Sequence, residues 1–207
     1  MSNVYITKSS TYLPNDPVSN DDMEKHLGLV NNTPSKARAL ILRNNQIKTR
    51  YYALDDKGNP THTNAEITAR AIDGLFDENF KKEDMELLSC GTTSADQIQP
   101  SHASMVHGQL NIGKSVEVNT AMGLCNSGMN ALNYGFLSVK AGVKENAVCV
   151  GSERFSSWMT ADKFDHEAEN LKLLEERPIV AFKREFLRWM LSDGAGAFLL
   201  ENKPREN

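Results

Sequence analysis

Short runs of consecutive apolar residues recur along the chain and predict buried strands. Each run is bounded by polar or turn-forming residues and is too short for an independent helix, which is typical of strands covered on both faces. The expected strands are Val4–Thr7, Leu87–Thr92, Ser115–Asn119, Ala147–Gly151 and Gly196–Leu200. We therefore expect a sheet at the centre of the fold.

Apolar residues at helical spacing fill several of the segments between these strands. The expected helices run from 65 to about 79 after the cap Asn64, from Ser101 to about Leu110, and from about Cys125 to Ala141, before Gly142. Strands that alternate with helices indicate βαβ units. The pattern therefore predicts an α/β fold, with a mostly parallel mixed sheet and helices on both of its faces.

A charged stretch from 153 to 189 interrupts this alternation. Its middle, His166–Arg177, has a helical pattern, and Trp158 and Trp189 lie near its ends. We expect a core made of 1–152 and 190–202, with the stretch of about 153–189 as a cap-like excursion over a pocket.

Composition and charge narrow the class of protein. The 207 residues are 40% hydrophobic and 24% charged, with a net charge of -4, which is ordinary for a globular protein and gives no basic surface for nucleic acid or anionic lipid. The amino terminus has no signal-peptide pattern, and the apolar runs are too short to span a bilayer. We expect a cytoplasmic protein with no nucleic-acid or membrane partner.

The cysteines suggest free thiols rather than disulfides or a metal site. There are three of them, an odd number without CxxC pairs, and we expect neither metal nor cofactor. Cys90 and Cys149 lie within apolar strands and are read as small core residues. Cys125 instead lies at a strand-to-helix turn, where side chains are presented to a ligand, although burial in the core is its alternative interpretation.

The surroundings of Cys125 favour a nucleophile. At the start of a helix, the unpaired N–H groups and the positive end of the dipole stabilise a thiolate. Gly123, Ser127 and Gly128 are small and leave room for a substrate beside the sulfur. The helix that follows is apolar on nearly every side, which predicts that it is buried.

Six segments resemble one family, in order and at similar spacing. The family's own motif is given in quotation marks after the segment of this chain that resembles it. The segments are Tyr12–Pro14 with Asn20–Leu27, Gln46–Tyr51 ("GIRERH"), Thr92–Ala95 with Pro100-Ser101 ("TTSA…PS"), Leu124–Gly128 ("ACAG"), Val150–Glu153 ("VGSD") and Ser192–Ala197 ("GDGAGA"). The chain resembles the ketoacyl-acyl-carrier-protein synthase III branch of the thiolase superfamily, over essentially all of its length.

This resemblance implies an acyltransferase in fatty-acid or related lipid or polyketide biosynthesis. Cys125 would take an acyl group from a thioester and condense it with malonyl-acyl-carrier protein to a 3-ketoacyl thioester. Gln99, Gly123 and Leu124 would line the substrate pocket, the partners would be acyl-carrier protein and acyl or malonyl thioesters, and two copies would pair through 115–119. The resemblance also implies one half, at 1–207, of a five-layer αβαβα fold.

Some features depart from the family pattern. The family's catalytic histidine and asparagine belong to its carboxyl-terminal half, which we expect to be absent here, so the chain alone would be catalytically incomplete. His102 and His107 are weak replacements, and the other histidines lie in polar, surface-like stretches. Leu40 stands where some relatives hold a coenzyme A adenine on tryptophan, which favours a carrier-protein primer. Gln99 stands where head-to-head condensing enzymes have a catalytic glutamate, which disfavours that chemistry.

Two alternatives to the acyltransferase remain open at this point. The first is a noncatalytic half-size subunit that binds a partner or acyl chains. The second is an unrelated thiol hydrolase, which is weakened because no histidine lies at the end of an element near Cys125.

Overall fold

The computed structural model describes residues 2–35, 38–164 and 186–205, which belong to two compact units. Unit 1 comprises 1–13, 63–153 and 194–207, and unit 2 comprises 14–62 and 154–193. The expected helix at 166–177 lies outside the described residues, and the predicted cap-like excursion stays a prediction.

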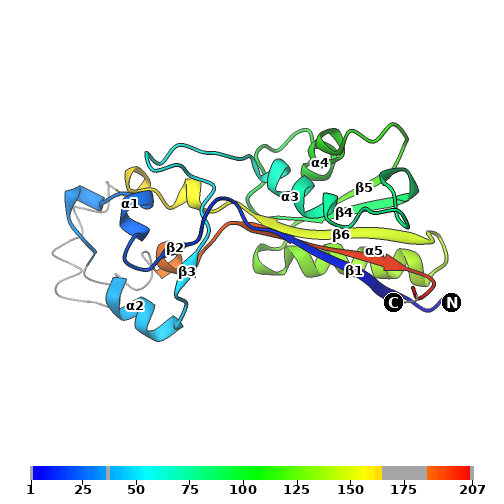
Figure 1. The fold of residues 1–207 in the computed structure, drawn as a ribbon, viewed down its shortest axis with the longest axis horizontal. Helices are drawn as coiled ribbons and strands as arrows, with labels where there is room; N and C mark the ends of the chain where they lie inside the picture. The colour runs from blue at the N-terminus through cyan, green and yellow to red at the C-terminus, as the bar shows by residue number, and fades with distance from the viewer. Residues whose placement is uncertain (1, 36–37, 165–185, 206–207) are drawn as a thin grey trace. The chain divides into compact units, whose positions relative to one another are not determined.

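Unit 1 is built on a five-stranded sheet with the order β1-β7-β6-β4-β5 (Figure 1). Strand β6 is parallel to β4 and β4 is parallel to β5, whereas β7 is antiparallel to both of its neighbours, β1 and β6. Four strands therefore run in one direction and β7 runs in the other. This confirms the predicted mixed, mostly parallel sheet, and each of the five predicted strands overlaps an observed one.

The elements of unit 1 alternate as the sequence pattern predicts. They are β1 (Tyr5–Tyr12), α3 (Asn64–Asp73), η2 (Lys82–Asp84), β4 (Leu87–Gly91), α4 (His102–Leu110), β5 (Glu117–Ala121), η3 (Leu124–Asn126), α5 (Ser127–Lys140), β6 (Asn146–Glu153) and β7 (Gly194–Glu201).

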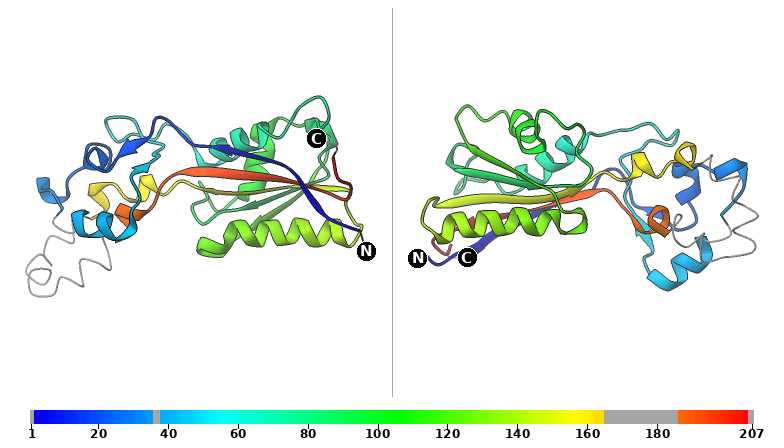
Figure 2. Two further views of the ribbon diagram at one scale, coloured as in Figure 1. Left: turned by 60° about the horizontal axis from the view of Figure 1, so that its bottom comes forward. Right: turned by 180° about the vertical axis from the view of Figure 1, so that it is seen from behind.

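Helices cover both faces of this sheet (Figure 2). Successive residues of a strand point to opposite faces, and β6 shows the two coverings directly. The Ser152 hydroxyl accepts a hydrogen bond from Thr68 of α3 at 2.7 Å, whereas Gly151 lies against Gly128 of α5 on the other face. The predicted arrangement of helices on both faces is confirmed.

The amino-terminal caps of the helices follow the sequence, with one correction. Ser101 caps α4 through its side chain, as predicted. The cap of α3 is Thr63 rather than Asn64, because Thr63 and Glu66 form a reciprocal capping box. Asn64 is buried instead, and its amide donates to the Thr92 hydroxyl at 2.8 Å and to the Ser94 carbonyl at 3.0 Å.

Unit 2 is made of short elements around its own apolar cluster. The elements are β2 (Val18–Ser19), α1 (Met23–Leu27), η1 (Val30–Asn32), α2 (Arg38–Asn45), β3 (Thr49–Arg50), η4 (Ser156–Trp158) and η5 (Ala161–Lys163), and residues 186–190 are also helical. The cluster consists of Val18, Met23, Leu27, Ile41, Tyr52, Leu54 and Trp189.

Buried polar side chains connect the separate segments of unit 2. The Asp193 carboxylate accepts from the backbone N–H groups of Ala53, at 2.7 Å, and of Ser156, at 2.9 Å. The Arg50 guanidinium donates to the Trp189 carbonyl at 2.6 Å. These bonds satisfy backbone groups that short elements leave unpaired, so they hold together a unit with little regular structure.

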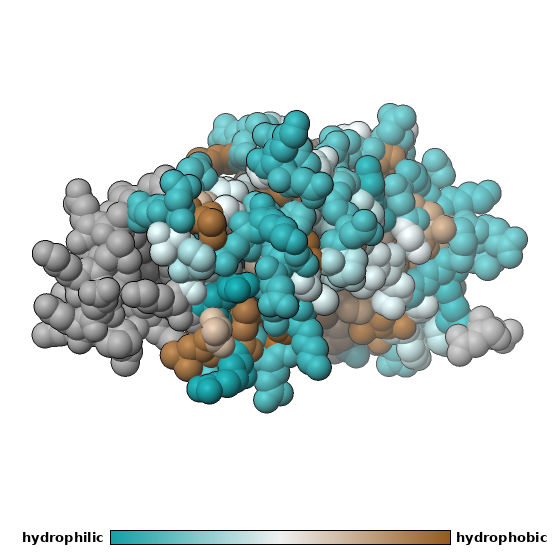
Figure 3. Space-filling view, turned by 60° about the vertical axis from the view of Figure 1, so that its left-hand side comes forward, coloured by the Kyte–Doolittle hydropathy of each residue, from teal (hydrophilic) through white to brown (hydrophobic). Residues whose placement is uncertain are grey.

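The coloured part of the face shown in Figure 3 is mainly hydrophilic, with small hydrophobic patches. None of the helices in the described ranges combines the length and the apolar character that a bilayer crossing requires.

Candidate active site

Cys125 lies in a turn that joins β5 to α5. The strand ends at Ala121, the 3-10 turn η3 covers Leu124–Asn126, and α5 begins at Ser127. We call residues 122–127 the Cys125 loop. The prediction of a strand-to-helix turn is confirmed, and Cys125 stands just before the amino end of a 14-residue helix.

Unusual backbone geometry turns the chain within this loop. Gly123 has φ 155° and Leu124 has φ 52°, a left-handed value that is costly for a residue with a side chain. Side-chain bonds hold this conformation: the Asn130 amide donates to the Met122 carbonyl at 3.0 Å, and the Ser127 hydroxyl donates to the Leu124 carbonyl at 2.7 Å. A tight turn stabilised in this way fixes where the backbone at Cys125 lies.

Glycines bring the start of α5 unusually close to the sheet. A Cβ atom added to Gly91 would lie 2.1 Å from the Ser127 carbonyl oxygen, and one added to Gly128 would lie 3.3 Å from the Gly151 Cα. Gly91 and Gly151 are register partners on β4 and β6. They form a floor without side chains, on which the first turn of α5 rests.

A polar network ties the Cys125 loop to the segment after β4. The Glu153 carboxylate accepts from the backbone N–H of Thr93 at 2.9 Å and from that of Ser94 at 3.0 Å. The hydroxyls of Thr93 and Ser127 are 3.3 Å apart. Glu153 therefore positions Thr93, which contacts the helix start beside Cys125. Sequence reasoning missed this role of Glu153, although Thr93, Ser94 and Glu153 all lie in segments that resemble the family motifs.

The three cysteines differ in exposure as the sequence pattern predicts. Cys125 is exposed, whereas Cys90 and Cys149 are buried. Burial raises the pKa of the Cys149 thiol to about 12, and it raises the pKa of the Cys90 thiol as well. Among these thiols, Cys125 is therefore the one that is open to an incoming reactant.

The burial of α5 differs from its prediction. Its residues Ala131, Gly135 and Val139 are buried against the sheet, but Met129 and Leu137 are 60% and 54% exposed. The helix is apolar on more sides than the described part of this chain covers. The expectation of all-round burial is therefore wrong for this chain by itself.

The predicted pocket residues lie on two loops. Gly123 and Leu124 belong to the Cys125 loop, and the Leu124 side chain is 72% exposed. Gln99 is exposed on the loop between β4 and α4. Thr93, on the same loop as Gln99, contacts Ser127. The structure therefore joins the two loops through Thr93, and the assignment of a pocket to Gln99, Gly123 and Leu124 stays a prediction.

His102 is buried, 1% exposed, on the opposite face of the sheet from α5. Its Nε2 lies 3.1 Å from the Thr68 hydroxyl and 3.2 Å from the Ser152 hydroxyl. Burial lowers the pKa of His102 to about 4, despite an opposing effect of Asp96. A buried neutral histidine among hydroxyls is part of the core, in line with its weak standing as a catalytic base.

This burial predicts a pH-dependent loss of stability. The pKa of His102 is depressed in the folded chain, so below about 6.5 the unfolded chain takes up a proton that the folded chain does not. The free energy of unfolding should fall by about 2.5 kcal/mol from this residue between about pH 7.5 and 4.5. Urea titrations of the wild type and of His102→Gln, which cannot titrate, should show that difference in pH dependence. His62→Gln is the control, and equal pH dependence in His102→Gln and the wild type would contradict the prediction.

Comparisons with known proteins agree with this geometry. The family model "Thiolase, N-terminal domain" matches residues 57–177, more than half of the chain. The chain is 29% identical to a beta-ketoacyl-(acyl carrier protein) synthase III of Sulfurovum sp. over 147 residues, which are 70% of this chain and 40% of the relative. It is 28% identical to the synthase III of Neisseria gonorrhoeae over 151 residues, 73% of this chain and 44% of the relative.

Solved structures show the same fold. The 3-oxoacyl-(acyl carrier protein) synthase III of Aquifex aeolicus matches with a TM-score of 0.69 and 22% identity, covering 99% of this chain and 55% of that one. The corresponding protein of Xanthomonas oryzae matches with a TM-score of 0.72 and 19% identity, covering 96% and 56%. The chain thus spans about half the length of these proteins. The predicted resemblance to the synthase III branch is confirmed. The chain belongs to the thiolase family, and it contains that family's N-terminal domain.

Proposed function

We propose that this chain supplies the nucleophile of an acyltransferase that forms carbon–carbon bonds, with Cys125 as the residue that carries the acyl group. One observation carries the proposal: the exposed thiol of Cys125 stands in a fixed turn at the start of α5. The family and the similarity to synthases III support it, because those relatives are named for 3-ketoacyl synthesis on acyl-carrier protein.

The first step would be acyl transfer to sulfur. The Cys125 thiolate attacks the carbonyl carbon of an acyl thioester, the bond from that carbon to the donor sulfur breaks, and the donor leaves as a thiol after taking a proton. The backbone N–H of Cys125 is the proposed donor to the oxyanion that forms on the way. A thiolate is well suited to this exchange as both nucleophile and leaving group.

The second step would be decarboxylative condensation. A malonyl thioester loses CO₂ and becomes an enolate, whose α-carbon attacks the acyl carbonyl carbon on Cys125. The bond from that carbon to the Cys125 sulfur breaks, which releases the Cys125 thiolate and the 3-ketoacyl product. The resemblance assigns this step to a histidine and an asparagine from the family's carboxyl-terminal half. The proposal therefore assigns only the acyl-carrying cysteine, and not the decarboxylation, to these 207 residues.

The proposed partners follow from the same reasoning. We infer acyl-carrier protein and acyl or malonyl thioesters as reactants. We also infer a cytoplasmic homodimer that pairs through β5, since β5 is an edge of the sheet in this chain and an open edge tends to associate. Leu40 is 44% exposed on α2 and offers an incoming adenine no tryptophan, which supports a carrier-protein primer.

A noncatalytic subunit is the second candidate, and the open face of α5 favours it. A groove of about 300 Å³ is lined by apolar residues of β1, α5 and β7 and their flanks, namely Val4, Ile6, Met129, Leu132, Phe136 and Leu200, together with Asn133. Such a face can bind a protein partner or an acyl chain without any covalent step.

Acyl loading tests the acyltransferase proposal. The complete gene product and, in parallel, the 207-residue chain are incubated with one acyl group presented on acyl-carrier protein or on coenzyme A, and adducts are located by peptide mass spectrometry. We expect the acyl group on Cys125, faster from the carrier protein, and no adduct in Cys125→Ala. An unmodified Cys125 in the complete, folded product would contradict the proposal and favour the noncatalytic subunit.

A further inference from the structure

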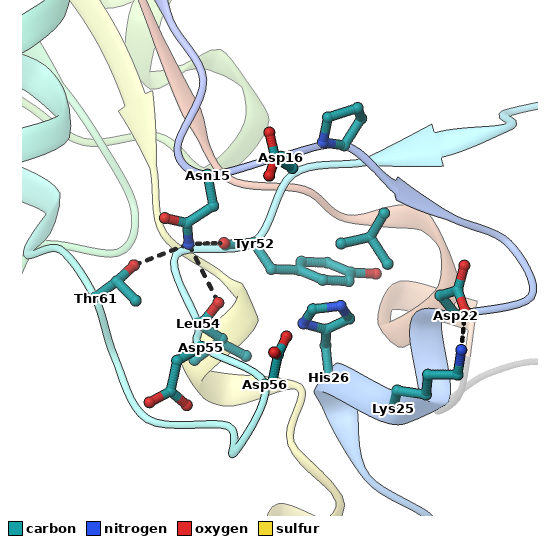
Figure 4. Close-up of a pocket in the computed structure, with 12 residues that line it drawn as sticks. Asn15, Asp16, Asp22, Lys25, His26, Tyr52, Leu54, Asp55, Asp56 and Thr61 are labelled. Atoms are coloured by element: carbon teal, nitrogen blue, oxygen red, sulfur yellow. Dashed lines mark hydrogen bonds and ion pairs between the residues drawn. The ribbon is translucent and has the colours of Figure 1, made fainter.

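Unit 2 contains a polar pocket that the acyl-transfer chemistry does not use. Its volume is about 520 Å³, within the range of small-molecule sites. It is formed by the segment before α1, by α1 itself and by the segment 52–61 (Figure 4). The ionisable and polar side chains that line it include Asp16, Asp22, Lys25, His26, Tyr52, Asp55 and Asp56.

The pocket has an excess of negative charge, and part of that charge is not engaged. Asp22 pairs with Lys25, and Asp55 accepts hydrogen bonds that close the turn after it. Asp16 and Asp56 have no partner that the described residues provide. Lys25 is the one lysine of the lining, and no arginine belongs to it. Because Lys25 pairs with Asp22, the lining has no cation to balance Asp16, Asp55 and Asp56.

Two buried polar atoms in the same pocket lack hydrogen-bond partners. Tyr52 is only 2% exposed, yet its hydroxyl has no partner within the described chain, and the same holds for Nδ1 of His26. The two rings lie close together, with centroids 6.2 Å apart, and Figure 4 shows the Tyr52 ring between Asp16 and His26. A buried polar group without a hydrogen-bond partner is destabilising, so a ligand that hydrogen-bonds to both atoms would gain from their bonding.

The chemistry of the lining selects the kind of molecule. The Tyr52 oxygen and the carboxylates are hydrogen-bond acceptors, and burial raises the pKa of Tyr52, so its hydroxyl stays neutral. No group of three or more His, Cys, Asp or Glu side chains in the described ranges converges as a metal ion requires. A ligand with several separated N–H donors and a positive charge matches this arrangement better than a point charge.

We propose that this pocket binds a small organic polycation through its ammonium or guanidinium groups, with Asp16 and Asp56 as the ionic partners and Tyr52 as a hydrogen-bond acceptor. The proposal is independent of the acyltransferase, because every residue in it belongs to unit 2 and Cys125 belongs to unit 1.

Calorimetric titration of the 207-residue chain with spermidine tests the proposal. We expect saturable binding at one site, weakened about tenfold or more by Asp16→Asn and by Asp56→Asn. Tyr52→Phe removes only the hydroxyl and should weaken binding about fivefold to tenfold. Asp21→Asn is the matched control, since Asp21 is an exposed aspartate of unit 2 outside this lining, and it should leave binding unchanged.

Three results would overturn the proposal. The first is a lack of saturable binding of spermidine. The second is an equal loss in Asp21→Asn and in the pocket variants, which would mean diffuse attraction to a negative surface. The third is tighter binding of Mg²⁺ than of spermidine, sensitive to the same aspartates, which would assign the pocket to a metal ion. Circular dichroism of each variant establishes that it is folded before it is titrated.

Discussion

Iodoacetamide should alkylate Cys125 of the native chain at least about a hundredfold faster than Cys90 or Cys149. Cys125 is exposed and the other two thiols are buried. Only the thiolate reacts, and a thiol whose pKa is about 12, as burial makes that of Cys149, is ionised to about one part in 10⁴ at pH 8. Burial therefore protects these thiols twice, by excluding the reagent and by suppressing their ionisation.

Peptide mass spectrometry over a time course measures this selectivity. Cys125→Ser should leave the native chain almost unlabelled, and urea should expose Cys90 and Cys149 to rapid labelling in every variant. Early adducts on Cys90 or Cys149 in the folded chain would contradict their burial. An unlabelled Cys125 would contradict its exposure and remove the basis for acyl transfer, because an inaccessible sulfur cannot receive an acyl group from a carrier.

The strands and the place of Cys125 could be predicted because their signals are local. An apolar run such as that of β4, Leu87–Gly91, has few alternatives to a buried strand when polar and glycine residues bound it. Cys125 could be singled out since it follows one such run and precedes a long helical pattern. In both cases a few neighbouring residues contain the whole argument.

Features that depend on distant segments could not be predicted. The Thr63 cap is a local signal that the sequence analysis missed, since Thr63 and Glu66 stand at capping-box spacing. The bonds of Asn64 with Thr92 and Ser94, which are 28 and 30 positions along the chain, have no such local signal. The apolar composition of α5 predicts that the helix is buried, but it does not show whether residues of this chain bury it. Helix propensity and hydrophobic pattern are weak guides wherever tertiary contacts decide.

The prediction that His26 is a solvated surface residue was only partly right, for the same reason: its side chain is half-buried. Polar neighbours in sequence suggested a solvated ring, but the structure places it beside Tyr52 with Nδ1 buried. The two residues are brought together only by the folding of unit 2 around its apolar cluster. Pockets of this kind arise between segments, so a sequence scanned position by position does not reveal them.

Gly91→Ala should lower the free energy of unfolding by about 3 kcal/mol or more, because overpacking against backbone cannot be relieved by a side-chain movement. The new Cβ would lie 2.1 Å from the Ser127 carbonyl oxygen, 2.4 Å from its carbon and 2.7 Å from the Gly128 nitrogen. To accept it, the first turn of α5 must move away from β4. The Cys125 loop is continuous with that turn, so it must move as well.

Gly108→Ala is the matched control, since it adds the same methyl group to a glycine of α4 where the new Cβ would meet no atom within 4 Å apart from the neighbouring backbone of its own helix. Alanine is favoured over glycine in a helix, so this variant should be neutral or more stable by up to about 1 kcal/mol. Urea denaturation measures both variants, and the alkylation rate of Cys125 reports separately on the loop. Equal stability of the two variants would mean that α5 does not rest on a glycine floor. A destabilised Gly91→Ala with an altered alkylation rate would instead show that the close approach of helix and sheet both stabilises unit 1 and sets the position of Cys125.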